Sequence, residues 1–351
     1  MASVSTNANP VGLCGIEFIE YSSNDPAALD RLFTEFGFSR SMRHHRKALD
    51  YYNQNDIHFI VNSEPKSYGA TFSATHGPCV SAMGWRVKDA VKAHAEAVKR
   101  GAKSAQGDYN HESGKAVPAI YGIGESLIYF IDDFKDPSRY PSLGFTPHPK
   151  PNKVPDKGFL NIDHLTNNVF QGTMTQWSNF YKDIFGFTEI RYFDIRGAKT
   201  GLQSYALRSP CTTFCIPINE GTEKKSQINE YLDEYKGPGV QHIAFTSKDI
   251  VKSLTALRGT GIKTLDIDDQ YYGEVFDRIP NVTEDHKVLR DLNILIDGDS
   301  DGYLLQIFTK NIIGPIFIEI IQRKNHHSFG EGNFGALFRS IERDQEKRGY
   351  L

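Results

Sequence analysis

The sequence lacks the features that mark membrane proteins, secreted disulfide scaffolds and nucleic-acid-binding proteins. It has no stretch of about 18 apolar residues, and its start, MASVSTNANPVGLCG, has neither a basic segment nor an apolar run, so neither a membrane-spanning helix nor a signal peptide is predicted. Its 4 cysteines are scattered, which favours reduced thiols in the cytoplasm. The formal net charge is −3 without a basic run among aromatics, so no nucleic-acid partner is expected.

The composition that remains is typical of a globular protein. Apolar residues make up 39% and charged residues 24% of a chain of 351 residues, long enough for two domains with separate cores. Residues 135–157 are rich in proline, which lacks the amide donor that sheets and helices need. We predict an interdomain linker over 135–157, between an N-terminal domain (1–134) and a C-terminal domain (158–351).

The two halves contain similar segments, which indicates duplicated units. HGPCVSAMGWRVKDAVKAHAEAVKRGAK in the first half parallels KGPGVQHIAFTSKDIVKSLTALRGTGIK in the second. Each unit opens with an alternating apolar strand, continues with a helix that starts at an aspartate and stops at a glycine, and ends in further strands. Four such units predict an α+β fold of two domains, each an incomplete barrel with the helices outside.

Three polar residues stand inside apolar strand patterns of the second half. Glu319 lies in PIFIEIIQ, His164 in GFLNIDHLT and His242 in GVQHIAF. Two histidines and one carboxylate on neighbouring strands form the facial triad that binds non-haem iron(II) and leaves coordination positions open. Each of them alone is more often a surface or core residue. The first half has Phe18 and Ala82 at the histidine positions, and this asymmetry indicates a metal site in one domain only.

Other histidines fit a metal site less well. The pairs His44–His45 and His326–His327 are adjacent in sequence, and adjacent side chains on a strand point to opposite faces. For the same reason we expect Asp163 to point away from the metal.

The motifs of the second half resemble the 4-hydroxyphenylpyruvate dioxygenase family of the vicinal oxygen chelate group. The resemblance rests on NIDHLTNNV, PINEGTEKKSQINEY, GVQHIAF, GYLLQIFTK and FIEIIQRKNHHSFGEGNFGALFRSIERDQ. It implies paired βαβββ-type units, one Fe(II) per chain, and conversion of 4-hydroxyphenylpyruvate and dioxygen to homogentisate and carbon dioxide. It also implies a homo-oligomer, either a dimer or a tetramer.

Residue by residue, the resemblance places the metal ligands on His164, His242 and Glu319. It implies catalytic roles for Gln241, Gln306 and Phe308. It implies substrate contacts for Ser209, Asn219, Gln227, Phe317, Phe329, Asn333, Phe334 and Leu337. Residues 329–349 resemble a C-terminal lid helix, with Leu337 and Ile341 on its apolar face and Glu342 among the charged residues opposite; a permanently packed terminal helix is the alternative.

Two other functions remain open. A 4-hydroxymandelate synthase would use the same substrate and metal. The resemblance implies that such a synthase differs from the dioxygenases at the pocket positions of Pro217 and Phe334, where this sequence has the residues of the dioxygenases. A non-catalytic binding protein of the same fold would not need the complete triad.

Overall fold

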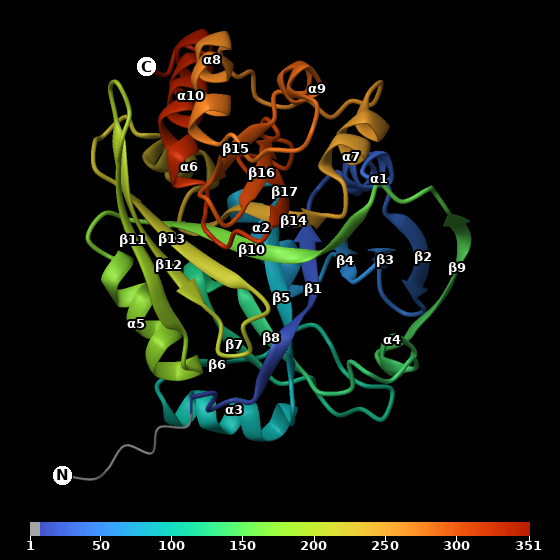
Figure 1. Ribbon diagram of the computed structural model, residues 1–351. Helices are drawn as coiled ribbons and strands as arrows, with labels where there is room; N and C mark the ends of the chain where they lie inside the picture. The colour runs from blue at the N-terminus through green and yellow to red at the C-terminus, as the bar shows by residue number, and fades with distance from the viewer. Residues whose placement is uncertain (1–7) are drawn as a thin grey trace, which may run out of the picture.

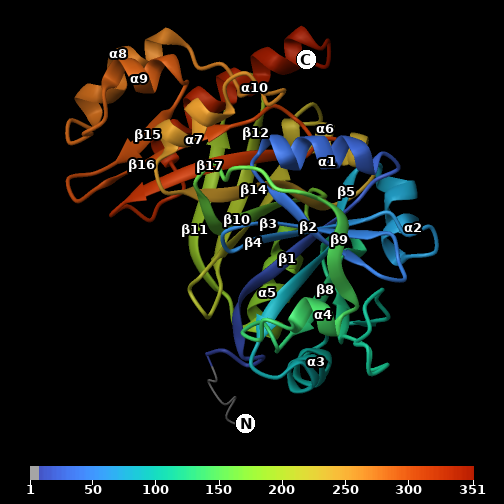
Figure 2. The same ribbon diagram turned by 90° about the vertical axis from the view of Figure 1, so that its right-hand side faces the viewer.

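The computed structural model describes residues 8–351 and contains two curled sheets that lie side by side, with helices on their outer faces (Figures 1 and 2). The first sheet has the order β6-β7-β8-β5-β1-β4-β3-β2-β9. Its strands are β1 (Leu13–Ser22), β2 (Ser39–His44), β3 (Leu49–Gln54), β4 (Ile57–Asn62), β5 (Cys79–Val87), β6 (Ser104–Ala105), β7 (Ala119–Tyr121), β8 (Leu127–Ile131) and β9 (Phe145–Asn152).

The second sheet has the order β11-β12-β13-β10-β14-β17-β16-β15. Its strands are β10 (Phe159–Val169), β11 (Thr188–Arg196), β12 (Gly201–Arg208), β13 (Cys215–Gly221), β14 (Gly239–Ser247), β15 (Leu295–Gly298), β16 (Tyr303–Phe308) and β17 (Phe317–Lys324). Read from β15 to β11, this order matches the order of the first sheet from β6 to β2, strand for strand. Of the strands that the structure describes, only β9, at the end of the first sheet, has no counterpart in the second. This symmetry confirms the duplicated units and the α+β fold of two curled sheets.

The helices that connect the strands begin where the sequence predicts. Asp25, Asp89 and Asp249 cap three helices, each accepting a hydrogen bond from a backbone N–H three residues on. The helices are α1 (Pro26–Glu35), α2 (Tyr68–His76), α3 (Ala90–Lys99), α4 (Arg139–Ser142), α5 (Met174–Phe185), α6 (Gln227–Tyr235), α7 (Ile250–Leu257), α8 (Asp269–Arg278), α9 (His286–Asp291) and α10 (Phe334–Lys347), with short 3-10 turns at Ile123–Glu125 and Glu331–Asn333.

The proline-rich segment contains regular structure. Residues 135–157 include α4 and β9, and β9 pairs with β2 at the edge of the first sheet. The prolines alternate along β9 (FTPHPKPN), and an edge strand tolerates the missing amide donors because one of its sides has no partner strand. Within residues 135–157, Phe145–Asn152 therefore forms an edge strand of the first sheet.

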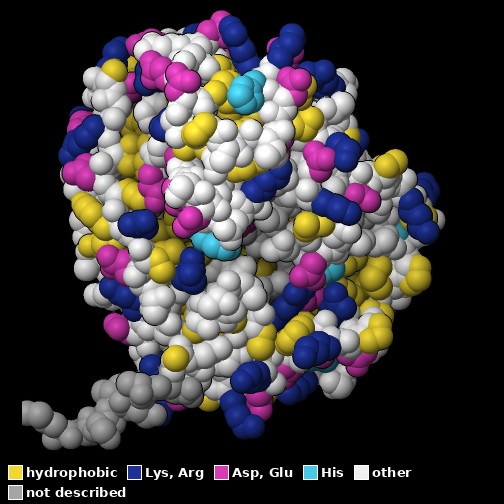
Figure 3. All heavy atoms as spheres, in the orientation of Figure 1, with side chains coloured by type: hydrophobic (Ala, Val, Ile, Leu, Met, Phe, Trp, Pro, Cys, Tyr) yellow, Lys and Arg dark blue, Asp and Glu magenta, His cyan; other side chains and the backbone are white. Residues whose placement is uncertain are grey.

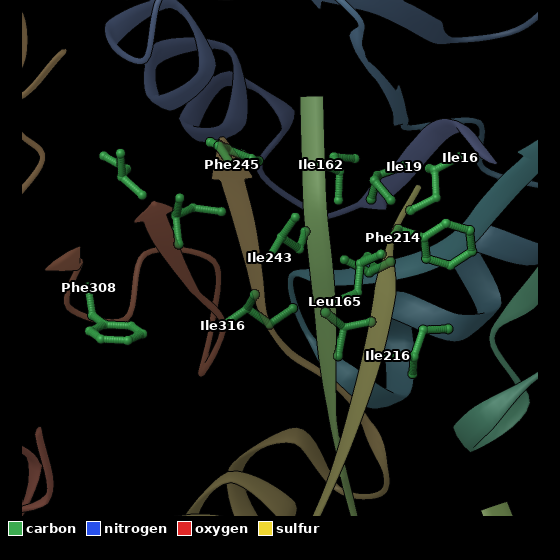
Figure 4. Close-up of a cluster of buried hydrophobic side chains, with 14 of the residues drawn as sticks. Ile16, Ile19, Ile162, Leu165, Phe214, Ile216, Ile243, Phe245, Phe308 and Ile316 are labelled. Atoms are coloured by element: carbon green, nitrogen blue, oxygen red, sulfur yellow. The ribbon is translucent and has the colours of Figure 1, made fainter. Parts of the chain in front are cut away.

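The two sheets share one apolar core. Trp85 of β5 packs against Phe185 and Phe214 of the second half, with ring centroids 4.9 and 5.6 Å away, and Phe38 lies 5.8 Å from Phe245. Figure 4 shows Ile16 and Ile19 of β1 facing the strands that carry Ile162, Leu165, Ile216 and Ile243. The N-terminal half therefore supports the strands that carry the candidate ligands.

The surface carries positive and negative side chains interspersed, with no single-sign field on the face in Figure 3. Between residues 8 and 351, no helix is both long and apolar enough to cross a membrane. The C-terminal helix α10 lies at the far side of the molecule from α3 (Figure 1).

Candidate metal centre and active site

The register of three neighbouring strands brings the predicted triad together. On the central strand β14, Ala244 pairs with His164 of β10 on one side and with Glu319 of β17 on the other. His242 lies two residues earlier on β14, so its side chain is on the same face of the sheet. Three strands that are distant in sequence thus present two imidazoles and one carboxylate to the interior of the second curled sheet.

The three side chains converge on a single point. Glu319 Oε2 lies 3.1 Å from His164 Nε2 and 3.4 Å from His242 Nε2, and the two Nε2 atoms are 3.3 Å apart. All three side chains are buried. Within residues 8–351, this is the only group of three His, Cys, Asp or Glu side chains whose ligand atoms converge in this way.

Oxygen atoms behind the imidazoles set their tautomers. His164 Nδ1 lies 2.8 Å from Asp163 Oδ2, and His242 Nδ1 lies 3.0 Å from Gln241 Oε1, so each Nδ1–H donates outward. Both Nε2 lone pairs then face the Glu319 carboxylate, and three electron-rich atoms within about 3 Å repel one another unless a cation lies between them. The donor set therefore fits a divalent metal ion, supported by a second layer of hydrogen bonds.

The charges at this point shift the pKa values of the side chains. Burial lowers the pKa of His164, but the negative charge of Glu319 and the hydrogen bond to Asp163 outweigh it and raise that pKa to about 9. Burial raises the pKa of Glu319, while the two imidazoles lower it more strongly, to about 2. Burial lowers the pKa of His242.

Asp163 is not among the converging ligand atoms, as expected, but its side chain contacts His164 where the opposite face of the strand was expected. The pairing of β10 with β14 shifts register between Ile162 and His164, so Asp163 occupies a β-bulge, where the two-residue alternation of side chains is broken. Its carboxylate therefore turns back to His164 on one side and reaches Arg323 on the other, with two contacts of 2.8 Å. Asp163 supports a ligand without being one.

The triad opens into a cavity lined largely by aromatic and other apolar side chains. The structure places most of the predicted substrate-contact residues along it, together with several that the sequence analysis missed. The predicted ones are Asn219, Gln227, Gln241, Phe308, Phe317, Phe329, Phe334 and Leu337, joined by Pro217 and Ile341, which the sequence analysis also singled out; the missed ones are Thr166, Phe193, Ile195, Leu202, Ser204 and Phe338. The Phe317 ring stacks on the His242 ring at 4.8 Å, and the Phe329 ring meets His164 edge-on at 5.6 Å.

Three predicted residues lie outside this cavity. Ser209 lies in the turn after β12, where its hydroxyl accepts a hydrogen bond from the Phe214 N–H, and Ser204 lines the cavity instead. Gln306 is buried against Gly330, whose backbone lies too close to the Gln306 amide to leave room for a Cβ atom. Asn333 is buried and accepts a hydrogen bond of 2.7 Å from the Tyr271 hydroxyl. These positions follow from long-range packing that the motifs alone do not reveal.

The C-terminal helix α10 covers the cavity through Leu337, Phe338 and Ile341. Glu342, expected on the charged outer face, is buried: its carboxylate accepts hydrogen bonds from the N–H groups of Ala198, Lys199 and Thr200 at 3.0–3.1 Å. These residues form the tip of the β11–β12 hairpin (Figure 1). A loop of free N–H groups far away in the sequence binds the carboxylate, so helix periodicity alone could not predict its burial.

Comparisons with known proteins agree with this geometry. The family described as "Hydroxyphenylpyruvate dioxygenase, HPPD, N-terminal" matches residues 7–145, and "Glyoxalase/Bleomycin resistance protein/Dioxygenase superfamily" matches residues 161–307. The chain is 56% identical to Protein MelA of Shewanella colwelliana, covering 99% of this chain and 100% of that protein. It is 46% identical to a 4-hydroxyphenylpyruvate dioxygenase of Legionella pneumophila, covering 98% of each.

A solved structure shows the same fold at low sequence identity. A mutant of 4-hydroxymandelate synthase from Streptomyces coelicolor superposes with a TM-score of 0.83 at 22% identity, covering 95% of this chain and 99% of that one. The identity to full-length 4-hydroxyphenylpyruvate dioxygenases is about twice as high. The chain therefore belongs to the 4-hydroxyphenylpyruvate dioxygenase family.

Proposed function

We propose that this chain is an iron(II)-dependent dioxygenase that converts 4-hydroxyphenylpyruvate and dioxygen to homogentisate and carbon dioxide. One Fe(II) per chain is bound by His164 Nε2, His242 Nε2 and Glu319. The observation that carries the proposal is the convergence of these three ligand atoms at the wall of an aromatic cavity. Two neutral imidazoles and one carboxylate on one side of a metal form the facial triad of non-haem iron oxygenases.

The chemistry divides between the metal and the protein. A bound Fe(II) supplies the electrons that activate dioxygen and open positions that the two oxygens of a 2-oxo acid can chelate. The protein fixes the ligands: Asp163 and Gln241 hold the Nδ1–H groups, so both Nε2 atoms stay unprotonated and directed at the metal position.

The cavity beyond the triad fits an aromatic side chain. Phe308, Phe317, Phe329 and Phe334 provide flat apolar walls, and edge-on or stacked contacts with these rings fix the attitude of a substrate ring. We propose that Phe308 and Phe334 hold the ring between them. The end of the substrate ring that is far from the metal would then meet polar groups, because Asn219 and Gln227 line the same cavity.

A phenol hydroxyl matches this polar end. The side chains of Ser204, Asn219 and Gln227 can each donate or accept, and the Asn219 amide lies 3.5 Å from Gln241 Oε1. We propose that Asn219, Gln227 and Ser204 recognise the hydroxyl, with Ser204 in the role that the sequence motif assigned to Ser209. A cavity that only needed to be apolar would not contain these groups.

Helix α10 closes the cavity over the metal position. Its apolar residues line the site, and excluding water protects the reaction from side reactions. We propose that α10 acts as a lid that opens for substrate entry and product release.

The decisive experiment measures oxygen uptake with 4-hydroxyphenylpyruvate and then identifies the product. Homogentisate with one carbon dioxide per dioxygen supports the proposal. 4-Hydroxymandelate would instead identify the synthase, against which Pro217 and Phe334 in the cavity already argue. Absence of uptake by iron-loaded protein would leave a binding protein.

Assembly and compartment are further proposals. We propose a homo-oligomer, either a dimer or a tetramer, that works in the cytoplasm; the four cysteines are all free thiols in the structure, in keeping with a reducing compartment. Light scattering after size-exclusion chromatography measures the number of chains, and a monomer at micromolar concentration would contradict the assembly proposal.

A further inference from the structure

A buried ion pair connects the metal ligand His164 with the chain segment that closes the cavity. The pair joins Asp163 of β10 to Arg323 of β17. We call residues 326–334 the closing segment, because they lead into the first residue of α10 and contribute Phe329 and Phe334 to the cavity wall. We propose that Arg323 is a positioning residue: through Asp163 it couples the order of the closing segment to the orientation of His164. The proposal rests on the metal site proposed above and goes beyond it, because it assigns a role to residues that touch neither metal nor substrate.

The first link runs from Arg323 to His164. Arg323 donates from Nε to Asp163 Oδ1 and from Nη2 to Asp163 Oδ2, both at 2.8 Å. The same Oδ2 accepts from His164 Nδ1 at 2.8 Å. A two-point guanidinium–carboxylate contact fixes the plane of the carboxylate, which in turn fixes the rotation of the imidazole. His164 therefore depends on Arg323 for its direction.

The second link runs from Arg323 to the closing segment. Its remaining nitrogen, Nη1, donates to the backbone carbonyl oxygens of Ser328 at 2.6 Å and His326 at 3.2 Å. The next residue, Phe329, places its ring edge-on against the His164 ring. One guanidinium therefore holds the carboxylate behind the ligand and the backbone that positions an aromatic wall in front of it.

The location of the pair favours a positioning role over simple stabilisation. Asp163 and Arg323 are only 15% and 14% exposed, and the free energy of such a buried pair is largely offset by the loss of hydration. The pair instead fixes the positions of its partners relative to one another, because all three guanidinium nitrogens of Arg323 donate hydrogen bonds at once. If the two links are coupled, an ordered closing segment strengthens metal binding, and a bound metal orders the segment by the same factor.

The first test measures Co(II) affinity and the Co(II) absorption spectrum in apo-protein. Asp163→Ala should weaken binding by about 10–100-fold and shift the Co(II) bands as His164 turns. Asp163→Asn, which keeps an acceptor oxygen, should weaken it less. Arg323→Lys should also weaken binding, because a lysine makes one contact where arginine makes several. The double variant Asp163→Ala/Arg323→Lys should bind no more weakly than Asp163→Ala alone.

Losses that multiply in the double variant, or wild-type Co(II) affinity in Arg323→Lys, would overturn the proposal. The matched control is Glu17→Gln, which disrupts a buried carboxylate–arginine contact in the first half and should leave Co(II) affinity unchanged. If that variant fails to fold, the exposed pair of Arg290 and Asp269 supplies a second control in Arg290→Lys. Wild-type protein that binds neither Co(II) nor Fe(II) would refute the metal site itself, which is a separate result.

The second test follows backbone hydrogen exchange of residues 326–334. In wild type, Co(II) should slow exchange across this segment, whereas in Arg323→Lys saturating Co(II) should slow it clearly less. Equal metal-induced protection in both proteins would show that the segment and the metal are not coupled through Arg323. Exchange in β3, which lies in the first sheet, serves as an internal reference.

Discussion

The two halves of the chain share one scaffold, and they differ at the three positions where the second half carries the His164, His242 and Glu319 triad. In the second half, His164, Ala244 and Glu319 pair across β10, β14 and β17. In the first half, Phe18, Gly84 and Tyr129 pair in the same way across β1, β5 and β8. The counterpart of His242 is Ala82. The proposed metal centre therefore depends on side chains placed on an architecture that both halves possess.

The corresponding space in the first half is filled. Phe18 packs edge-on against Tyr109 at 5.6 Å, and Tyr109 packs against Tyr129 at 4.9 Å. The buried carboxylate of Glu20 accepts hydrogen bonds from Tyr109 and from Ser81. Rings and a satisfied polar network thus occupy a region that the second half keeps open for a ligand.

The acid before the ligand position occurs in both halves. Glu17 precedes Phe18 and Asp163 precedes His164, and the register shift of each strand falls at this acid. Among the residues that the structure describes, Glu17 contacts the arginines Arg86 and Arg139 and no imidazole. The comparison teaches that the bulged acid is a feature of the fold, and that Asp163 contacts an imidazole only because a histidine follows it.

The largest effect is expected from removing the ligands. His164→Ala, His242→Ala and Glu319→Ala should each abolish turnover and bring bound iron close to zero, because two ligands do not hold the metal. Metal analysis of folded protein, checked by circular dichroism, measures this. The matched control is Tyr129→Phe at the position equivalent to Glu319, which should keep its iron. Full iron occupancy in a ligand variant would remove that residue from the site.

A second large effect should follow removal of the helix that has no counterpart in the first half. After β8 the chain continues into α4 and β9, whereas after β17 it forms α10. Truncation before Phe329 should leave iron bound by the three ligands, though more weakly because most of the closing segment is lost, and should uncouple oxygen consumption from homogentisate formation, because water reaches the metal. Tight coupling in the truncated protein would refute the lid, and a failure to fold would favour a permanently packed helix.

In the first half, the residue at the ligand position should contribute to stability instead. Phe18 is 1% exposed, so Phe18→Ala should lower the free energy of unfolding by about 3–5 kcal/mol. Urea denaturation measures the loss, and metal titration of the same folded variant should give wild-type affinity. A marked loss of metal affinity would show that the halves are coupled more tightly than their contacts suggest.

Glu20 should make the stability of the first half depend on pH. Burial, reinforced by the charge of Asp108, raises its pKa from 4.5 to about 7, although Tyr109 and Ser81 donate hydrogen bonds to it. The folded state therefore holds the proton more tightly, and its stability falls as pH rises from about 4.5 to about 7, by about 3 kcal/mol in total. Glu20→Gln should remove this decline in denaturation of metal-free protein, and an unchanged decline would contradict the assignment.

The smallest effects concern substrate recognition. Ser204→Ala, Asn219→Ala and Gln227→Ala should each raise the barrier for 4-hydroxyphenylpyruvate by about 1–3 kcal/mol and affect phenylpyruvate much less. The ratio of kcat/KM for the two substrates measures this difference. Ser209→Ala is the matched control, because its hydroxyl serves a turn. Equal losses on both substrates would mean that these residues do not recognise the phenol hydroxyl.

The fold and the triad could be predicted because they depend on patterns that repeat. Comparing the two halves identified His164 and His242 as polar exceptions at apolar positions, and the observed register agrees. Alternating apolar residues and aspartate caps likewise predicted the strands and the helix starts. These signals are local or repeated, so they need no knowledge of the distant chain.

The errors arose where distant segments or local irregularities decide the outcome. The β-bulge places Asp163 against His164 where the opposite face of the strand was expected, and the hairpin tip buries Glu342. Ser209 and Ser204 lie five positions apart on the same stretch of chain, and only three-dimensional packing shows which one faces the cavity. Asn333 adjoins the lid in sequence, but Tyr271 of α8 binds its side chain.

The apolar core shared by the two sheets limits how the protein can be engineered. The catalytic half expressed alone would expose Phe159, Phe245 and Phe214, which the first half covers in the intact chain. An exposed apolar surface of this kind promotes aggregation. A smaller catalyst based on this scaffold therefore needs a redesigned surface at that interface, and a split version should work only if its two fragments are produced together.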